Sequence, residues 1–137
     1  MQRAEAVNHP THYGGEHNPY EAIKVIEAWG LGFCLGNAVK YLSRAGKKDP
    51  DKLIEDLEKT AWYVNRQLES GKSDGCIFFR SVYNPFTVAR EWDLSPTLGG
   101  VLIAIVCSFE KSSADKDLNE ALRLLQKEIS RLKGASL

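Results

Sequence analysis

Four side chains that can bind an anion share one face of a helix predicted over residues 33–45. They stand at positions i, i+3, i+4 and i+7 of that helix: Asn37, Lys40, Tyr41 and Arg44. From residue 30 to residue 48 the sequence holds four basic residues, Lys47 among them, and no acidic residue. Because no acid in this stretch neutralises them, the pattern favours binding of an anion such as a nucleotide phosphate. A solvated helix face is the alternative interpretation.

Asp56 offers complementary chemistry on the next predicted helix. It lies on one side of that helix with Lys59 and Tyr63, at spacings of three and seven residues. Its carboxylate can hold a metal ion, orient a catalytic group, or form an ion pair with Arg44 across the hairpin between the two helices. The spacing leaves these three roles open.

The N-terminal segment carries the histidines. His9, His12 and His17 can be ligands of a metal ion, but Pro10 and the pair Gly14–Gly15 argue against a helix that holds them together. We therefore expect no structural metal. We expect instead a loop that folds over the site and lends His12 and its neighbour Tyr13 to a ligand.

Capping signals divide the chain into helices. An Asn or Asp followed by a proline is typical of a helix start, and it occurs at Asn18–Pro19, Asp49–Pro50 and Asn84–Pro85. Apolar residues then recur at helical spacing, and glycines end the first three helices. The pattern predicts an all-α fold in a single domain, residues 1–137.

The second half of the chain repeats the first. We predict a unit made of a short helix and a helical hairpin, present as a motif-bearing copy (18–70) and a degenerate copy (84–134) joined by a linker (72–83). Trp29 and Trp92 stand at matching positions, so both should be buried in a pseudo-symmetric bundle. The alignment also predicts a helix over Val101–Phe109, although its β-branched residues are typical of a strand.

The polar face is kept in only one copy. Its counterparts in the second copy are small or apolar: Gly100, Ile103, Ala104 and Cys107. This apolar stripe predicts burial in the bundle or in a subunit interface, and therefore a homo-oligomer as one outcome. The asymmetry favours a binding site over a solvated face in the first copy.

Composition narrows the class of protein. The chain has 137 residues, of which 43% are hydrophobic and 26% charged, as in ordinary globular domains. Eighteen basic residues balance eighteen acidic ones, so the chain lacks the overall positive charge of a nucleic-acid binder. The longest apolar run, Val101–Cys107, is too short to span a membrane. The polar N-terminus has no signal-peptide core, which predicts a cytoplasmic protein. Three cysteines without paired spacing predict buried free thiols.

Several of these segments together resemble a phage-encoded family. They are Asn8-His9-Pro10-Thr11-His12-Tyr13, then Glu21, then Gly36 through Lys48, then Asp56–Leu57 and Ala61-Trp62-Tyr63. The family is mostly of unknown function or described as nucleotide kinase-like, after a small phage enzyme that phosphorylates deoxynucleoside monophosphates without a P-loop. The resemblance covers about half of the chain. It implies a phage origin, the host cytoplasm, a nucleotide ligand and site residues that include His12, Tyr13 and Glu21.

These observations lead to one expected function and two alternatives. The expected function is phosphoryl transfer to a nucleoside monophosphate, with Mg²⁺ bound to the nucleotide. Lys40, Arg44 and Lys47 would hold the phosphates. Asn37 and Tyr41 would hold the sugar or the base, and Asp56 would orient a nucleophile or a metal. The first alternative is a nucleotide pyrophosphohydrolase, which needs several carboxylates on facing helices; Glu55 and Glu58 supply one pair. The second is a protein without catalysis that sequesters a nucleotide or binds a host protein.

Overall fold

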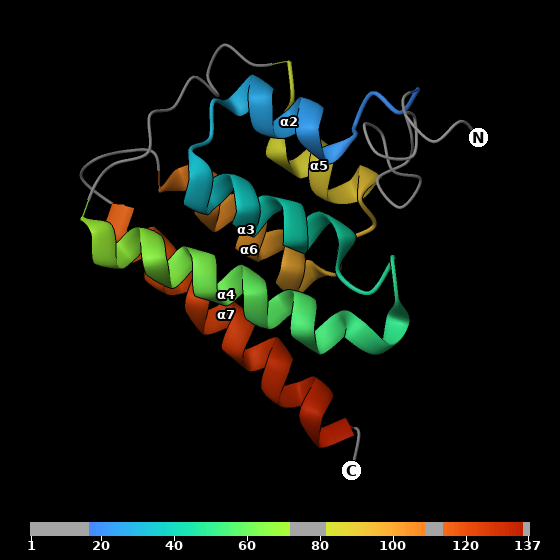
Figure 1. Cartoon of the computed structure of the whole chain (residues 1–137), viewed down its shortest axis with the longest axis vertical. Helices are drawn as coiled ribbons and strands as arrows, with labels where there is room; N and C mark the ends of the chain where they lie inside the picture. Colours follow the sequence, from blue (N-terminus) through green and yellow to red (C-terminus); the bar gives the residue numbers. More distant parts are fainter. Residues whose placement is uncertain (1–16, 72–81, 109–113, 136–137) are drawn as a thin grey trace.

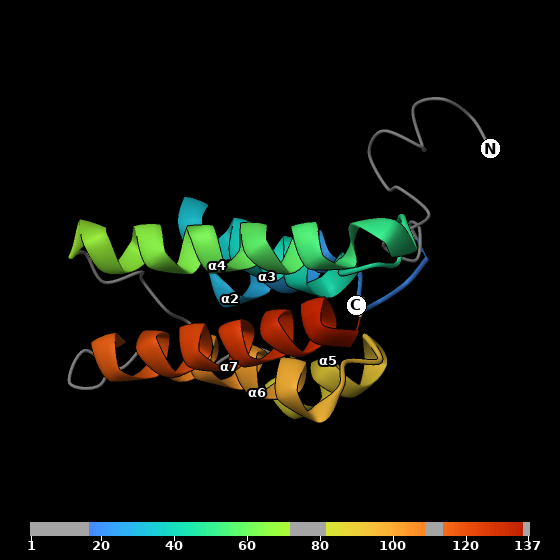
Figure 2. The same ribbon diagram turned by 90° about the horizontal axis from the view of Figure 1, so that it is seen from below.

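The computed structural model describes residues 17–71, 82–108 and 114–135, and these residues form helices arranged in two layers. The first layer holds α2 (Ala22–Trp29), α3 (Phe33–Arg44) and α4 (Leu53–Ser70), the last preceded by a 3₁₀ turn, η2 (Pro50–Lys52). The second holds α5 (Pro85–Glu91), α6 (Pro96–Cys107) and α7 (Ala114–Ala135). Figures 1 and 2 show the two layers, with α3 packed on α6 and α4 on α7. The predicted all-α class is confirmed, since the described residues contain no strand.

Side-chain caps mark the start of three of the described elements, η2, α5 and α6. Asn84 accepts a hydrogen bond from the Phe86 backbone N–H, and α5 begins at the following proline as predicted. Asp49 accepts from the backbone N–H of Asp51 and caps η2, which leads directly into α4. Ser95 accepts from the Leu98 N–H at the start of α6. Each cap satisfies a backbone donor that has no partner within its helix.

The predicted start of the first helix is wrong. Asn18 does accept a backbone hydrogen bond, from Tyr20, but this bond closes a turn, and α2 begins only at Ala22. Within α2, Ile23 is half exposed, whereas Val25 is fully buried. The later start shortens α2 to eight residues, and Gly30 ends it with a φ of 66°.

Two tryptophans join the layers by reciprocal hydrogen bonds. The indole N–H of Trp29 donates to the carbonyl of Tyr83 at 3.0 Å, and that of Trp92 donates to the carbonyl of Tyr20 at 2.7 Å. Both indoles are buried, as predicted, and each acceptor precedes the short helix of the other half. This exchange supports the predicted repeat, as does the equal length of α3 and α6, twelve residues each. That the two units superpose stays a prediction.

The second half supplies most of the apolar core. Val101 to Cys107 are helical, so the choice of helix over strand is confirmed there, whereas Phe109 lies outside the described residues. The prediction of buried thiols is wrong for Cys107, which is exposed, and Cys34 is half-buried. No helix in the described ranges has both the length and the apolar character that crossing a bilayer requires.

Candidate functional site

The candidate site lies on the hairpin formed by α3 and α4. The two helices run antiparallel, and the turn between them, residues 45–52, includes η2. Tyr41 of α3 stacks on Tyr63 of α4, with ring centroids 6.0 Å apart and planes inclined by 10°. This ring pair marks the middle of the face on which the polar side chains were predicted.

Three cations surround the ring of Tyr41. The Arg44 guanidinium carbon lies 4.6 Å from the ring centroid, and the ammonium groups of Lys40 and Lys59 each lie 5.2 Å from it. Contacts of this kind attract a cation to the ring face and hold the long side chains in place. Three positive charges therefore converge on one half-buried tyrosine, which concentrates positive potential on this part of the face.

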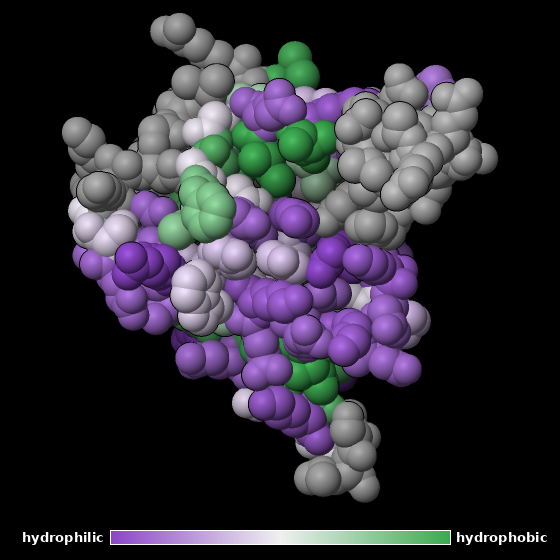
Figure 3. Space-filling model, in the orientation of Figure 1, coloured by the Kyte–Doolittle hydropathy of each residue, from purple (hydrophilic) through white to green (hydrophobic). Residues whose placement is uncertain are grey.

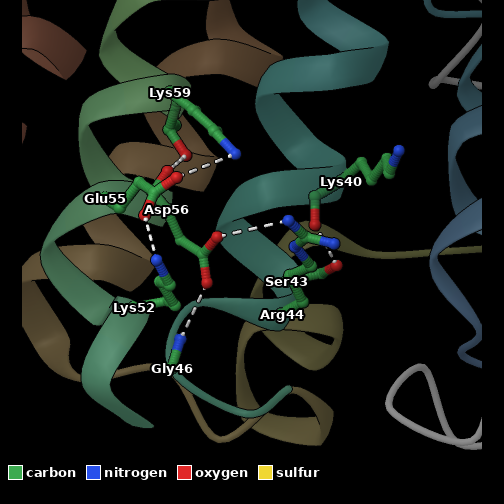
Figure 4. A network of polar contacts seen from close by, with 9 residues as sticks. Lys40, Ser43, Arg44, Gly46, Lys52, Glu55, Asp56 and Lys59 are labelled. Carbon is green, nitrogen blue, oxygen red and sulfur yellow. Dashed lines mark hydrogen bonds and ion pairs between the residues drawn. The ribbon is translucent and has the colours of Figure 1, made fainter. Parts of the chain in front are cut away.

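Asp56 forms the ion pair that was one of its three predicted roles. One carboxylate oxygen lies 3.4 Å from Arg44 Nη2, and the other accepts the backbone N–H of Gly46 at 3.2 Å (Figure 4). The Asp56 side chain is only 4% exposed and that of Arg44 13%. Since both oxygens of Asp56 are engaged, its evident task is to hold Arg44 and the turn. Arg44 Nε has no partner among the described residues.

Gly46 is required where it stands. Its φ is 74°, in the left-handed region that favours glycine, and an added Cβ would lie 3.2 Å from the Cβ of Leu53. A side chain here would disturb the backbone N–H that binds Asp56. The glycine thus fixes the turn against the start of α4 and, through Asp56, the position of Arg44.

A pocket of about 210 Å³ opens beside this ion pair, at the end of the hairpin where α4 begins. Four basic and three acidic side chains line it: Arg44, Lys48, Asp49, Lys52, Glu55, Asp56 and Lys59. Glu55 binds Lys52 at 3.1 Å and Lys59 at 3.3 Å, and the hydrogen bonds from these two lysines lower the pKa of Glu55. The expectation that no acid neutralises the cations of residues 30–48 is wrong for Arg44, because Asp56 of α4, eight residues beyond Lys48, forms an ion pair with it.

Lys47 does not serve as the predicted phosphate ligand in this arrangement. Its ammonium group donates a hydrogen bond to the carbonyl of Trp92, at the end of α5. Burial lowers the pKa of Lys47, and the nearby charge of Asp93 partly opposes that effect. Lys47 thus ties the turn of the candidate site to the second layer.

The remaining predicted residues are placed as follows. Asn37 donates its side-chain N–H to the carbonyl of Phe33 at 2.8 Å. Glu21 lies buried at the N-cap of α2, on a different element, with its carboxylate 3.9 Å from Lys24. His12 and Tyr13 lie outside the described residues, so their predicted role stays a prediction.

Two exposed aromatic rings extend the site and were missed. Phe33 is 75% exposed and Trp62 60%, and both contact Tyr63 edge-on, with centroids 5.9 Å and 5.0 Å from its ring. Figure 3 views this face, where hydrophilic side chains cover much of α4 and less polar ones gather toward the start of α3. Helical spacing could have found part of this group, since Phe33, Asn37 and Tyr41 follow one another at intervals of four residues.

The described geometry is thus that of a two-layer helical protein with an aromatic and cationic face on one hairpin. Residues 7–65 match a family described as a protein of unknown function (DUF3310). The chain is also similar to the Gene 1.7 protein of Enterobacteria phage T3, with 47% identity over 64 residues. That match covers 42% of this chain and 38% of the phage protein, so the chain spans well under half the length of its relative. No solved structure matches the chain.

The matched residues include the hairpin but not the second layer. Residues 7–65 contain α2, α3 and most of α4, with every candidate residue on the aromatic and cationic face. The separate match over 64 residues to a phage protein agrees with the predicted phage relationship.

Proposed function

We propose that the α3–α4 face binds a nucleotide. The observation that carries this proposal is the stacked pair Tyr41–Tyr63, which has exposed aromatic rings on one side and a cluster of cations on the other. Aromatic rings stack on nucleobases, and lysine and arginine side chains bind phosphate oxygens. A nucleotide carries both groups on one small molecule, so it matches both parts of the face.

The cations differ in how freely they can bind a phosphate. Among the described residues, neither Lys40 nor Lys48 has a carboxylate within ion-pair distance. The ion pair that the described residues give Arg44 involves Nη2, at 3.4 Å, so we assign the contact with a phosphate to its other terminal nitrogen, Nη1. We assign the first phosphate contacts to Lys40, Arg44 and Lys48, and a positioning role to Asp56.

We further propose that the bound nucleotide takes part in phosphoryl transfer. An oxygen of an acceptor monophosphate would attack the terminal phosphorus of a donor, and the bond from that phosphorus to its bridging oxygen would break. The donor would leave one phosphate shorter, with the electron pair on that bridging oxygen. Such reactions need mainly alignment and neutralisation of charge, which Arg44 and the lysines can provide. Mg²⁺ would enter bound to the nucleotide, because Asp56 is already engaged by Arg44 and Gly46.

A pyrophosphohydrolase is less well supported. Such enzymes hold Mg²⁺ with several carboxylates on facing helices. Here Glu55 binds Lys52 of η2 and Lys59 of α4, and Glu58 lies 3.7 Å from Lys133 of α7. Each of the two carboxylates therefore already has a cationic partner, and the pair does not converge on one point.

A thermal-shift panel tests nucleotide binding directly. Nucleoside mono-, di- and triphosphates are added with and without Mg²⁺, and the melting temperature is recorded. A nucleotide at 100 times its dissociation constant should stabilise the fold by about 2.7 kcal/mol. Lys40→Ala should reduce the shift, whereas Lys116→Ala, on the exposed surface of α7, should leave it unchanged. If no nucleotide raises the melting temperature, the proposal is wrong.

An assay of the reaction products distinguishes a phosphoryl-transfer enzyme from a protein that only sequesters its nucleotide, because only the enzyme releases a donor that is one phosphate shorter. The assay incubates the protein with a nucleoside triphosphate, a monophosphate acceptor and Mg²⁺, and chromatography then measures both diphosphate products. Transfer predicts equal amounts of the two products. Hydrolysis would shorten the donor without lengthening the acceptor.

A further inference from the structure

The aromatic and cationic parts of the site follow one another along the hairpin instead of surrounding one point. We infer that its ligand is a nucleoside triphosphate, with the base on the exposed rings and the phosphate chain running into the pocket at the α3–α4 turn. This inference rests on the proposed nucleotide binding and adds the length and the direction of the ligand. In a phosphoryl-transfer reaction, the α3–α4 face would therefore hold the donor.

The order of residues on α3 sets the direction. Phe33 is its first residue and Arg44 its last, so the exposed ring and the guanidinium are separated by eleven residues, about 16 Å along the helix axis. Phe33 contacts Tyr63, whereas Arg44 contacts Tyr41 and Asp56. The apolar end and the charged end of the face are therefore opposite ends of one helix.

The rings at the apolar end are the accessible ones. Tyr41 is half-buried and already contacts Tyr63 and three cations. Phe33 and Trp62 are mostly exposed, so a nucleobase meets them without displacing another side chain. The amide oxygen of Asn37, one turn from Phe33, is not needed for that residue's bond to the Phe33 carbonyl and can accept a hydrogen bond from the base or the sugar.

The pocket at the charged end is too small for a whole nucleotide. Pockets for small molecules commonly enclose about 300–1,000 Å³, whereas this pocket encloses about 210 Å³. Its lining is entirely charged, so it suits the phosphate chain and not the base. The base must then lie outside, which agrees with the position of the exposed rings.

Lys52 and Lys59, on the two sides of Glu55, set the number of phosphates that the ligand needs. Lys59 is one helical turn from Tyr63, so it meets the phosphate nearest the sugar. Lys52 lines the same pocket from the turn before α4, and its ammonium group binds one oxygen of the Glu55 carboxylate while that of Lys59 binds the other, at 3.1 and 3.3 Å. A monophosphate anchored on the rings reaches Lys59 but not Lys52. A triphosphate extends to both.

The mixed charge of the pocket favours the Mg²⁺ complex of that triphosphate. Four basic side chains face three acidic ones, an excess of one positive charge, which does not balance a free triphosphate. A bound Mg²⁺ cancels two of the ligand's negative charges and keeps a shell of water molecules. Carboxylates such as Glu55 and Asp49 can accept hydrogen bonds from these waters. The lysines are then left to bind the phosphate oxygens.

Calorimetric titrations with adenosine and thymidine mono-, di- and triphosphates, with Mg²⁺ present, test the inference. Affinity should rise at least about tenfold from mono- to triphosphate in the series whose base is accepted. Lys52→Gln should weaken triphosphate binding about fivefold and leave monophosphate binding unchanged, because an exposed charge contact is worth up to about that factor. Phe33→Ala should weaken all members of the series by the same factor. Lys116→Gln is the control.

The outcomes separate this inference from the proposed function. Equal affinities for mono- and triphosphates, or an equal loss for both in Lys52→Gln, would overturn the triphosphate assignment while nucleotide binding stands. If neither series binds at all, the proposed function fails and the inference fails with it. Because Lys52 is exposed, its replacement should not disturb the fold, and the melting temperature of the unliganded variant checks this.

Discussion

The hairpins α3–α4 and α6–α7 share an arrangement but differ in what covers their faces. The twelve-residue helix α3 presents Lys40, Tyr41 and Arg44, whereas the twelve-residue α6 has small or apolar residues at the corresponding positions. In α6, Ala104 is 8% exposed, and a Cβ on Gly100 would lie only 3.1 Å from Leu124 of α7. Ile103 is half-buried and Cys107 exposed, so the predicted burial of the apolar stripe is confirmed at Ala104 and wrong at Cys107. The two faces therefore differ mainly in chemistry, with small or apolar residues on α6 and rings and charges on α3.

The comparison shows how the second layer supports the site without contributing ligands for a phosphate. The carbonyl of Trp92 accepts a hydrogen bond from the Lys47 ammonium group. The indole N–H of Trp92 in turn donates a hydrogen bond to the carbonyl of Tyr20, which precedes α2. The turn that carries Gly46 and Lys48 is thereby tied to α5 and to the core. A rigid scaffold beneath a polar turn is what a preorganised binding site needs.

The largest difference between the hairpins should follow from placing the same charge on each. Ala104→Asp would bury an unpaired carboxylate between α6 and its neighbours and should lower the free energy of unfolding by about 3 kcal/mol or more. Asn37→Asp, on the accessible face of α3, should cost less than about 1 kcal/mol. Urea unfolding of both variants measures the difference. Similar losses for the two would mean that the faces have been assigned backwards.

Breaking the ion pair of the α3–α4 hairpin should have the next largest effect. Asp56→Ala leaves Arg44 with little exposure and no carboxylate, and should cost about 2–4 kcal/mol of stability. The double variant Arg44→Met with Asp56→Leu should recover part of this loss and yet bind no nucleotide. Chemical denaturation and nucleotide titration of both proteins provide the test. Full nucleotide affinity in the double variant would exclude Arg44 as a ligand.

A smaller effect on stability, but a clear one on binding, is expected from neutral changes on the same face. Asn37→Ala and Tyr41→Phe remove polar groups without leaving a core side chain that lacks its hydrogen bond. Each should therefore change the free energy of unfolding by less than about 1 kcal/mol. Nucleotide affinity should fall in both. An unchanged affinity would restrict the site to the rings and the lysines.

The smallest expected effect concerns Lys47 and pH. Burial lowers its pKa in the folded state from the usual 10.5, so the folded chain binds that proton less tightly than the unfolded chain. Stability should therefore rise with pH between the lowered pKa and 10.5. Relative to Lys47→Met, the wild type should gain stability as the pH increases through that window. A difference between the two proteins that is constant with pH would show that the charge of Lys47 is not desolvated.

Local signals predicted much of this fold. The caps at Asp49 and Asn84 and the helical period of the apolar residues fixed most of the helices, and the internal comparison correctly assigned Val101–Cys107 to a helix. The start of α2 was missed because Asn18–Pro19 closes a turn with the same side-chain hydrogen bond that starts a helix elsewhere. A local pattern cannot distinguish these two uses.

The site was predicted only in part, for a different reason. Spacing within α3 placed Lys40, Tyr41 and Arg44 together, and the contacts around Tyr41 agree with that grouping. The pair of Glu55 with Lys59 is local, four residues apart on one helix, and follows from the spacing. Contacts between distant segments depend on packing, so the reach of Lys47 to Trp92 was not foreseen. Exposure of Phe33 is likewise a property of the assembled hairpin and not of its sequence.

Amide chemical shifts followed by NMR during a titration with the Mg²⁺ complexes of nucleoside triphosphates test the central claim most directly. The account predicts that the perturbed amides cluster in α3, in residues 45–52 and in α4 as far as Tyr63, whereas those of α6 and α7 stay nearly unchanged. It also predicts that Lys40→Ala weakens the titration and Lys116→Ala does not. Perturbations centred on α6 and α7, or none at saturating nucleotide, would contradict a nucleotide site on the α3–α4 face.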